Sequence, residues 1–360
     1  MFLPVLMLQR YGWAGFWVFF VPNVLGCSAM GYCLRRRGGP VSMAPAHQTA
    51  GRWFSLVTVA YHVFFVAYLT TELVPQAYPA IAMVAVLLAG WGLSTLKGRA
   101  WLGLAGCTYA VSIGVFVVLL GQENWPGTVL ERGAWSVERG EWGARPLTDL
   151  IWLAPITAFG FSLCPYLDLT LRRAAAEAPS PHAFAVFGLA FAVMLFMTCV
   201  LWLDGPGGIG PWAWVHLLLQ SVFTIGAHLR EIRLSPSHRR LRRWPVMALP
   251  LLAGIGYLLA RVALPGQDLG QTTYLRFLGC YGLVFPLYVW MFMGLPGRTA
   301  SQRPALIWYA IAVVLLAPFY EAGFNQNRAW LLVVPMLAYA LWGVGRLRRL
   351  TTGEKLGNPC

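Results

Sequence analysis

The sequence predicts an all-α polytopic membrane protein, and three observations support that fold class. Of the 360 residues, 58% are hydrophobic and only 11% are charged, whereas a soluble domain has about 25% charged residues. The apolar residues gather in runs of about 20, the length that a helix needs to span a bilayer. The basic residues fall between these runs. Too little polar surface remains to cover a water-soluble globule, so the solvent around this chain is lipid.

Eleven apolar runs are long enough to span, and each is bounded by charges or by glycine and proline turns. We expect the spans at about 11–34, 53–74, 78–96, 101–121, 148–171, 183–203, 212–230, 245–264, 274–295, 305–323 and 329–346.

The distribution of lysine and arginine predicts the orientation, because positively charged loops stay in the cytoplasm. With the N-terminus outside, every inner loop is basic, and only seven of the 27 basic residues fall on the outer side. These seven are Arg10, Arg132, Arg139, Arg145, Arg261, Arg276 and Arg328. The sequence therefore predicts an N-out/C-in topology and, for a chain of bacterial type, the cytoplasmic membrane.

The whole chain, 1–360, is expected to form one integral-membrane domain. It divides into a first helical part (1–121), an outer loop (122–146), a second helical part (147–295), and peripheral helices with a basic tail (296–360). Tryptophans alternate with charges in the outer loop, which is typical of a segment that lies in the headgroup region.

The formal net charge of +14 does not indicate nucleic-acid binding here, because the charges lie in loops beside a membrane. Six arginines gather in the loop from Arg230 to Arg243. We expect this loop to fix the topology and to contact anionic lipids.

The first span carries a proline and an asparagine at mid-depth, Pro22 and Asn23. Proline removes a backbone hydrogen bond and can kink a helix. One interpretation is a kinked helix in a tightly packed bundle. The other is a helix that opens at Pro22, with Asn23 and the freed carbonyls facing a polar cavity.

The seventh span carries a polar stripe, because His216, Gln220, Thr224 and His228 are spaced four residues apart and Ser221 adjoins them. Such a stripe either makes interhelical hydrogen bonds, worth about 0.6 kcal/mol each, or lines a path for a solute or ion. The two histidines are about 18 Å apart at 1.5 Å per residue, too far to share a metal.

The fifth span contains two features. "APITAFGFS" places Thr157, Gly160 and Ser162 at the depth where a transporter's discontinuous helix opens. Further along, Pro165 breaks the helix, and Asp168 can cap a new helix that leaves the membrane.

Two stretches, "GWAGFWVFFVPNVLGCSAMGY" and "APITAFGFSLCPYLDLTLRRA", resemble segments of secondary transporters with the LeuT-type inverted-repeat fold. Their character is nearest to sodium:solute and nucleobase–cation symporters. Asp168, Thr170 and Arg172 resemble the exit of the sixth core helix in the latter family, with Leu171 as an extra residue.

The resemblance implies a truncated five-plus-five repeat in which the fifth to ninth spans are the second half and the first core helix has no counterpart. It also implies Na⁺ or H⁺ as a possible coupling ion. In that register the seventh span would be the eighth core helix, where Ser221 and Thr224 supply hydroxyls.

We therefore expect transport of a small solute by alternating access. The path is expected to be lined by Pro22, Asn23, Thr157, Gly160, Ser162, His216, Gln220, Ser221 and Thr224. One alternative is a membrane scaffold, sensor or assembly factor that transports nothing. Another is a membrane-embedded enzyme that uses His216, His228 or Asp168.

No catalytic, cofactor-binding or metal-ligating residues are predicted. The sequence shows no nucleophile elbow, phosphate loop, HExxH or CxxCH motif. None of the seven cysteines forms a CxxC pair, and six of them lie in apolar runs.

Overall fold

A computed structural model describes residues 3–36, 39–40, 43, 47–73, 78–120, 145–201, 211–234, 243–265, 268–293 and 303–351. The outer loop at 122–144, most of the arginine-rich loop after Leu234, and the end of the tail lie outside the described residues. The expectations that concern those segments therefore stay predictions.

The described residues are helical almost throughout. The helices are α1 (Leu3–Cys33), α2 (Gln48–Leu73), α3 (Pro79–Leu93), α4 (Gly98–Leu120), α6 (Leu150–Leu163), α7 (Leu169–Glu177), α8 (Ala183–Leu201), α9 (Pro211–Leu234), α10 (Arg243–Ala263), α11 (Leu269–Gly279), α12 (Phe285–Tyr288), α13 (Arg303–Phe324) and α14 (Val333–Thr351). Two short strands, β1 (Arg35–Arg36) and β2 (Gly39–Pro40), pair antiparallel after α1.

Seven helical segments of the described chain are long and apolar enough to cross a membrane, and three shorter ones are apolar. Large apolar side chains cover the outside of the bundle, including Leu102 and Val117 on α4 and Val314 on α13. Exposed apolar surface of this extent is unfavourable in water, by about 25 cal/mol per Å². The prediction of an all-α membrane protein is therefore confirmed, whereas the count of eleven spans stays a prediction.

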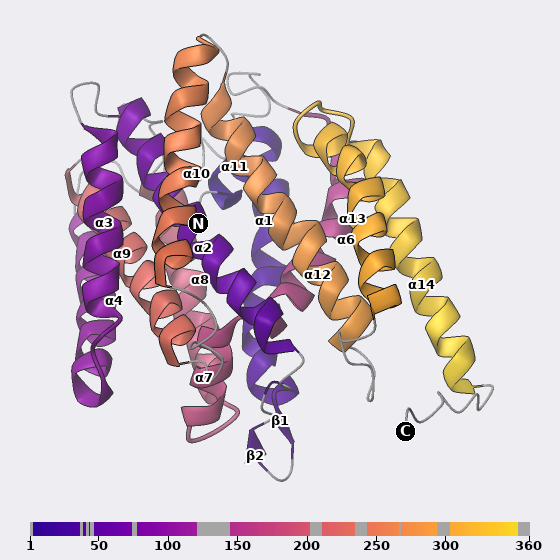
Figure 1. The fold of residues 1–360 in the computed structure, drawn as a ribbon, viewed down its shortest axis with the longest axis horizontal. Helices are drawn as coiled ribbons and strands as arrows, with labels where there is room; N and C mark the ends of the chain where they lie inside the picture. The colour runs from indigo at the N-terminus through magenta and orange to yellow at the C-terminus, as the bar shows by residue number, and fades with distance from the viewer. Residues whose placement is uncertain are drawn as a thin grey trace.

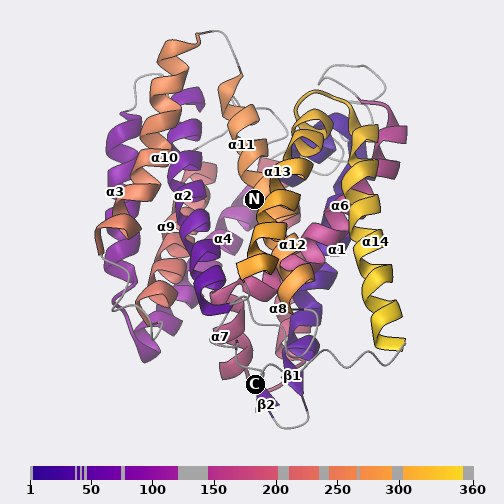
Figure 2. The same cartoon turned by 45° about the vertical axis from the view of Figure 1, so that its right-hand side comes forward.

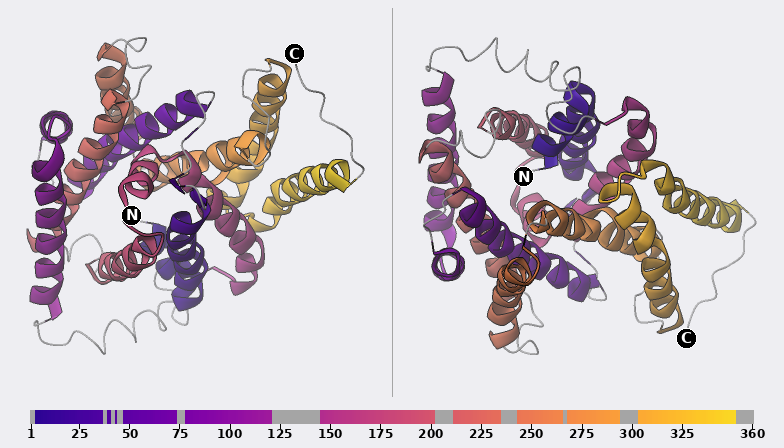
Figure 3. Two further views of the ribbon diagram at one scale, coloured as in Figure 1. Left: turned by 90° about the horizontal axis from the view of Figure 1, so that it is seen from below. Right: turned by 90° about the horizontal axis from the view of Figure 1, so that it is seen from above.

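The helices form two groups with α2 between them (Figures 1 and 2). α3, α4 and α9 gather on one side, and α13 and α14 lie on the other, as the end-on views show (Figure 3). α2 packs against α3, α9 and α10, and it also contacts α7 and α11. α1 packs against α6 and α8. α7 and the β1–β2 pair lie at one end of the bundle, the lower end in Figure 1, which we call the α7 end.

α1 consists of two parts that meet at Gly12. This residue has φ 61° and ψ −155°, a conformation that is essentially restricted to glycine. Before Gly12, the segment Leu3–Tyr11 is helical, and its residues Leu3–Leu8 are all buried. After Gly12, the helix continues to Cys33.

The two parts of α1 run in opposite directions. Tyr11 lies beside the start of α6, where its hydroxyl is 3.5 Å from Oδ2 of Asp149. Leu3 lies deeper, in a pocket with Gly160 of α6. Beyond the turn, Gly26 has descended again to the backbone of Phe161. Leu3–Tyr11 is therefore a half-length helix inside the bundle, a feature that the sequence analysis did not predict.

Of the two interpretations of the first span, the one in which α1 opens at Pro22 does not hold, because the backbone stays helical there and leaves the helical region at Gly12. Proline's fixed φ of about −65° is compatible with a helix, so Pro22 can remove one backbone hydrogen bond and crowd the carbonyl four residues earlier without ending the helix. The positive φ at Gly12, in contrast, cannot belong to a continuous helix.

The predicted break and cap after the fifth span are confirmed. α6 ends at Leu163, and a 3₁₀ turn (Cys164–Leu167) follows. Asp168 is extended, with φ −70° and ψ 110°, and its Oδ1 accepts hydrogen bonds from the N–H and the hydroxyl of Thr170, both at 2.7 Å. α7 then begins. Nε of Arg172 donates to the carbonyl of Tyr166 at 2.6 Å, which ties α7 back to the turn.

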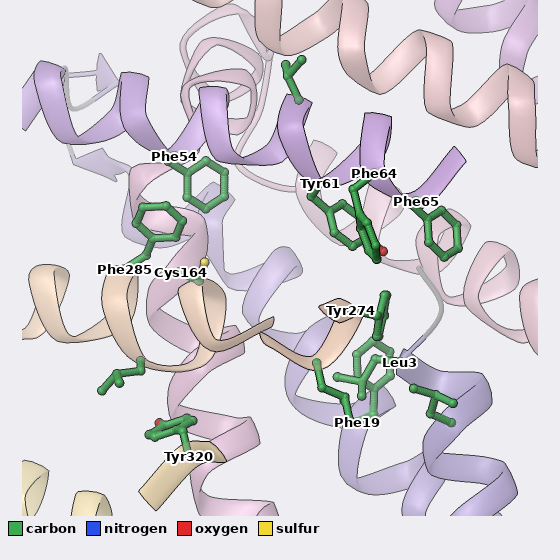
Figure 4. Close-up of a cluster of buried hydrophobic side chains, with 14 of the residues drawn as sticks. Leu3, Phe19, Phe54, Tyr61, Phe64, Phe65, Cys164, Tyr274, Phe285 and Tyr320 are labelled. Carbon is green, nitrogen blue, oxygen red and sulfur yellow. The ribbon is translucent and has the colours of Figure 1, made fainter. Parts of the chain in front are cut away.

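The chain from Leu269 to Met293 is helical throughout, and we call it the α11–α12 helix. Aromatic rings form the core between it and α2 (Figure 4). Phe54 of α2 lies 5.0 Å from Phe285 of α12, measured between ring centroids. Tyr61 lies 5.8 Å from Tyr274 of α11 in the same way. Such ring pairs stabilise the contact beyond the area that they bury. They fix the α11–α12 helix against α2, with Leu3 on its other side (Figure 4).

Candidate functional site

A pocket lies between α6, the α11–α12 helix, α13 and the start of α1, and we call it the α6 pocket. Its volume is about 40 Å³, space for roughly three water molecules. It is lined by Leu3, Ile156, Thr157, Gly160, Phe161, Leu275, Leu278, Gly279, Tyr281, Gly282, Tyr320 and Phe324. Two of the predicted site residues, Thr157 and Gly160, are among them.

α6 contributes a hydroxyl and a close backbone approach. The Thr157 hydroxyl donates to the carbonyl of Leu153 at 2.7 Å, so it is satisfied within its own helix while it faces the pocket. Gly160 lies directly on the opposite helix, since a Cβ there would be 3.2 Å from the carbonyl oxygen of Tyr281 and 3.3 Å from Cα of Gly282. The absence of a side chain at Gly160 lets the two backbones meet.

The opposite wall is a helix with widened turns. Between Leu269 and Met293 the chain is helical throughout, but two π-helical segments, Cys280–Val284 and Val289–Met293, flank α12. π-helical turns are rare and are frequent at functional sites. The first segment contributes Tyr281 and Gly282 to the pocket.

Two tyrosines of α13 hydrogen-bond to carbonyls of the first π segment. Tyr320 donates to the carbonyl of Gly282 at 2.7 Å, and Tyr309 donates to that of Val284 at 2.9 Å. The Tyr320 hydroxyl is also 3.2 Å from that of Tyr339 on α14. α13 thus stabilises a helix geometry whose own ladder is irregular, because buried carbonyls need donors.

On its other side the first π segment is linked to α2. The Tyr281 hydroxyl is 2.8 Å from the hydroxyl of Thr58, which also donates to the carbonyl of Phe54. The backbone of Tyr281 therefore faces the pocket while its side chain reaches α2.

Polar contacts close the pocket at the end remote from α7. The Arg10 guanidinium donates to Gln271 of α11 at 3.0 Å and to the carbonyl of Phe324 of α13 at 3.3 Å. Arg276 of α11 forms an ion pair with Glu321 of α13 at 2.8 Å. These contacts join the half-length helix of α1, α11 and α13 above the pocket lining.

The polar stripe of α9 lies elsewhere, against α4 and α2. Nδ1 of His216 is 3.0 Å from the hydroxyl of Ser112 on α4, and Nε2 of Gln220 donates to the same hydroxyl at 2.9 Å. Nδ1 of His228 is 3.2 Å from the hydroxyl of Ser55 on α2. These hydrogen bonds fit the packing interpretation of the stripe.

The other predicted residues are not in the α6 pocket. Ser221 is buried and Thr224 is half-buried on α9. Asn23 is buried on α1 beside the half-buried Pro22, and Ser162 is exposed on another face of α6. The structure thus unites Thr157 and Gly160 and leaves the α9 stripe apart from them.

Sequence reasoning missed the half-length helix, the π segments and Tyr320. Gly279 and Gly282, close together before Pro286, were the available signal for an irregular helix. The residues next to Tyr320 in the sequence do not indicate its role, because that role depends on a carbonyl group of another helix.

The described residues contain no group of three or more His, Cys, Asp or Glu side chains that could hold a metal ion. Comparisons of the chain with protein-family models, with curated proteins and with solved structures give no match.

Proposed function

We propose that this chain is a secondary transporter that moves a small solute across the cytoplasmic membrane by alternating access, with the α6 pocket as the solute site. The observation that carries the proposal is a pocket between two irregular helices, one widened beside the pocket and the other interrupted just beyond it. α6 is interrupted after Leu163, and the opposite helix is widened at Cys280–Val284. Irregular backbone inside a membrane is tolerated where it lines a cavity, and transporters bind their solutes at discontinuous helices.

The small volume of the pocket fits a closed state of such a cycle. At one end, Arg10 and the pair of Arg276 with Glu321 join α1, α11 and α13. At the other end, the 3₁₀ turn and α7 continue from α6. In the proposed cycle the contacts at these two ends of the pocket open one after the other, driven by Na⁺ or H⁺.

The eleven spans, the N-out/C-in topology and the truncated five-plus-five repeat belong to the same proposal. Each of the eleven expected ranges overlaps helical segments of the described chain, and the fifth also takes in the 3₁₀ turn and the start of α7. The turn between α3 and α4, the start of α4 and the end of α9 carry basic residues, and they lie at the α7 end (Figure 1). A basic end of this kind favours a cytoplasmic location.

A matched pair of glycine variants tests the solute site. Gly160→Leu puts a side chain against the backbone of Tyr281 and Gly282 and fills the pocket. Gly106→Leu adds the same side chain on α4, where no atom lies within 4 Å of a Cβ. Proteoliposomes with an imposed Na⁺ or H⁺ gradient would be supplied with radiolabelled amino acids, sugars and nucleobases. We expect uptake by the wild type and by Gly106→Leu, and loss of uptake in folded Gly160→Leu.

Thiol labelling tests alternating access without knowledge of the solute. In a background without native cysteines, Thr157→Cys should react with a membrane-impermeant maleimide added from either face of the vesicle, at rates that the ion gradient shifts in opposite directions. Reaction from one face only, under every gradient, would contradict the proposal.

A second candidate is a membrane scaffold that transports nothing. The observation in its favour is the use of His216, Gln220 and His228 for hydrogen bonds between α9 and its neighbours. This candidate would be favoured if the wild-type protein takes up none of the solutes and the Thr157→Cys variant is labelled from neither face.

A further inference from the structure

The last turns of α9 carry two arginines that lie on indole rings. The guanidinium carbon of Arg233 is 4.6 Å from the ring centroid of Trp91 on α3, and its Nη1 donates to the Ser94 hydroxyl at 2.8 Å. The guanidinium carbon of Arg230 is 5.0 Å from the ring centroid of Trp101 on α4. Cation–π contacts hold both guanidinium groups in place.

The turn from α3 to α4 adds three further positive features at the same place. α4 begins at Gly98, which has φ +52°, directly after the turn that contains Ser94. The first N–H groups of a helix have no partner within the helix, and its N-terminus carries a partial positive charge. Lys97 and Arg99 flank this N-terminus, and both are exposed.

The surface formed by the end of α9 and the turn from α3 to α4 has an excess of positive charge. Glu231 is the acidic residue of α9, and it accepts from Arg173 of α7 at 2.5 Å and from Arg230 at 3.4 Å. Within the described chain, no carboxylate lies within 4.0 Å of a basic nitrogen of Lys97, Arg99 or Arg233. We call Lys97, Arg99, Arg230, Arg233 and the start of α4 the basic cradle.

We propose that the basic cradle binds the phosphodiester headgroup of an anionic phospholipid. Guanidinium groups, an ammonium group and a helix N-terminus are the groups that proteins use to hold phosphate oxygens. The cradle lies at the end of an apolar outer surface, since Leu88 of α3 is 58% exposed and Leu102 of α4 is 67% exposed. The acyl chains of a lipid can lie along this surface, whereas a free phosphate ion makes no apolar contact with it. This inference is independent of the proposed transport.

The test uses purified, delipidated protein in a neutral detergent. Its unfolding temperature is measured against increasing phosphatidylglycerol, with phosphatidylcholine and inorganic phosphate as comparison ligands. We expect a saturable rise with phosphatidylglycerol and none with phosphatidylcholine or with inorganic phosphate at the same concentrations. An equal rise with inorganic phosphate would overturn the lipid assignment and indicate a site for a free anion.

Variants locate the effect in the cradle. Replacing Lys97, Arg99 and Arg233 with glutamine should raise the midpoint concentration of phosphatidylglycerol by about a hundredfold, since each charge contributes about 1 kcal/mol. Arg328→Gln removes an exposed charge from the segment between α13 and α14, which joins these helices at the end opposite α7 (Figure 1), and it should leave the midpoint unchanged. If the triple variant does not fold, Arg233→Lys keeps the charge but loses the flat contact with Trp91, and it should weaken binding severalfold. Wild-type binding by the cradle variants, or equal weakening by Arg328→Gln, would overturn the proposal.

Discussion

Tyr320 of α13 donates a hydrogen bond to the carbonyl oxygen of Gly282, at 2.7 Å, in the wall of the α6 pocket. Tyr309, about three turns earlier on the same helix, makes the equivalent bond to Val284 but does not line the pocket. The two tyrosines therefore form a natural pair of test and control positions.

Tyr320→Phe and Tyr309→Phe should each lower the free energy of unfolding by about 1 kcal/mol, because each removes a part-buried hydrogen bond between α13 and the first π segment. Only Tyr320→Phe should also change solute uptake or the labelling of Thr157→Cys. Unfolding in detergent and labelling in vesicles measure the two effects. Equal changes of labelling in both variants would contradict a special role for the pocket wall.

Gly12→Ala should destabilise the protein by about 1–3 kcal/mol, because alanine is strained at φ 61° and ψ −155°. The matched control is Gly103→Ala on α4, where no atom lies within 4 Å of a Cβ. We expect the control to unfold at the wild-type temperature or slightly above it, since alanine is the better helix former. An unfolding temperature of Gly12→Ala equal to that of the control would contradict the reversal of α1 at Gly12.

Asp168→Ala should expose the amides at the start of α7 to hydrogen exchange and cost about 1 kcal/mol, because Oδ1 caps Thr170 and Leu171. Asp168→Asn keeps a capping oxygen and should retain most of the protection. A loss of protection as large in Asp168→Asn as in Asp168→Ala would show that the negative charge, rather than the cap, holds α7.

The contact of α9 with α4 should appear in a double-mutant cycle of Ser112→Ala and Gln220→Leu. We expect a coupling energy of about 0.6 kcal/mol, the usual value for an interhelical hydrogen bond in a membrane bundle. Uptake by Gln220→Leu should follow the amount of folded protein, because Gln220 packs helices outside the α6 pocket. Loss of uptake in fully folded Gln220→Leu would instead place the α9 stripe in the solute path.

The helical fold was predictable because an apolar run of about 20 residues can satisfy its backbone in lipid only as a helix. The cap at Asp168 was predictable for a similar reason, since capping depends on residues within one turn. Thr157 and Gly160, which line the α6 pocket, could be singled out because small and hydroxyl-bearing residues are conspicuous in an apolar span.

The rest depends on contacts between distant segments. Leu3–Tyr11 is too short to span, so hydropathy alone does not place it in the membrane. Its burial depends on contacts with the second part of α1 and with α6, α11 and α13. The π segment at Cys280–Val284 is stabilised by Tyr309 and Tyr320, which come after it in the chain. The α9 stripe has the same sequence pattern whether it faces water or Ser112.

The π segment at Cys280–Val284 also lets the helix from Leu269 to Met293 hold one more residue than a regular α-helix with the same faces would. A regular α-helix turns by about 100° per residue, whereas a π-helical turn closes on the fifth residue instead of the fourth. Deleting one residue from Cys280–Val284 should therefore restore a regular ladder and leave Tyr288, whose hydroxyl is 3.1 Å from Nδ1 of His47, facing the same neighbour. A one-residue deletion in the regular part, Leu269–Gly279, should instead turn one side of the helix by about 100° against the other and be tolerated far less.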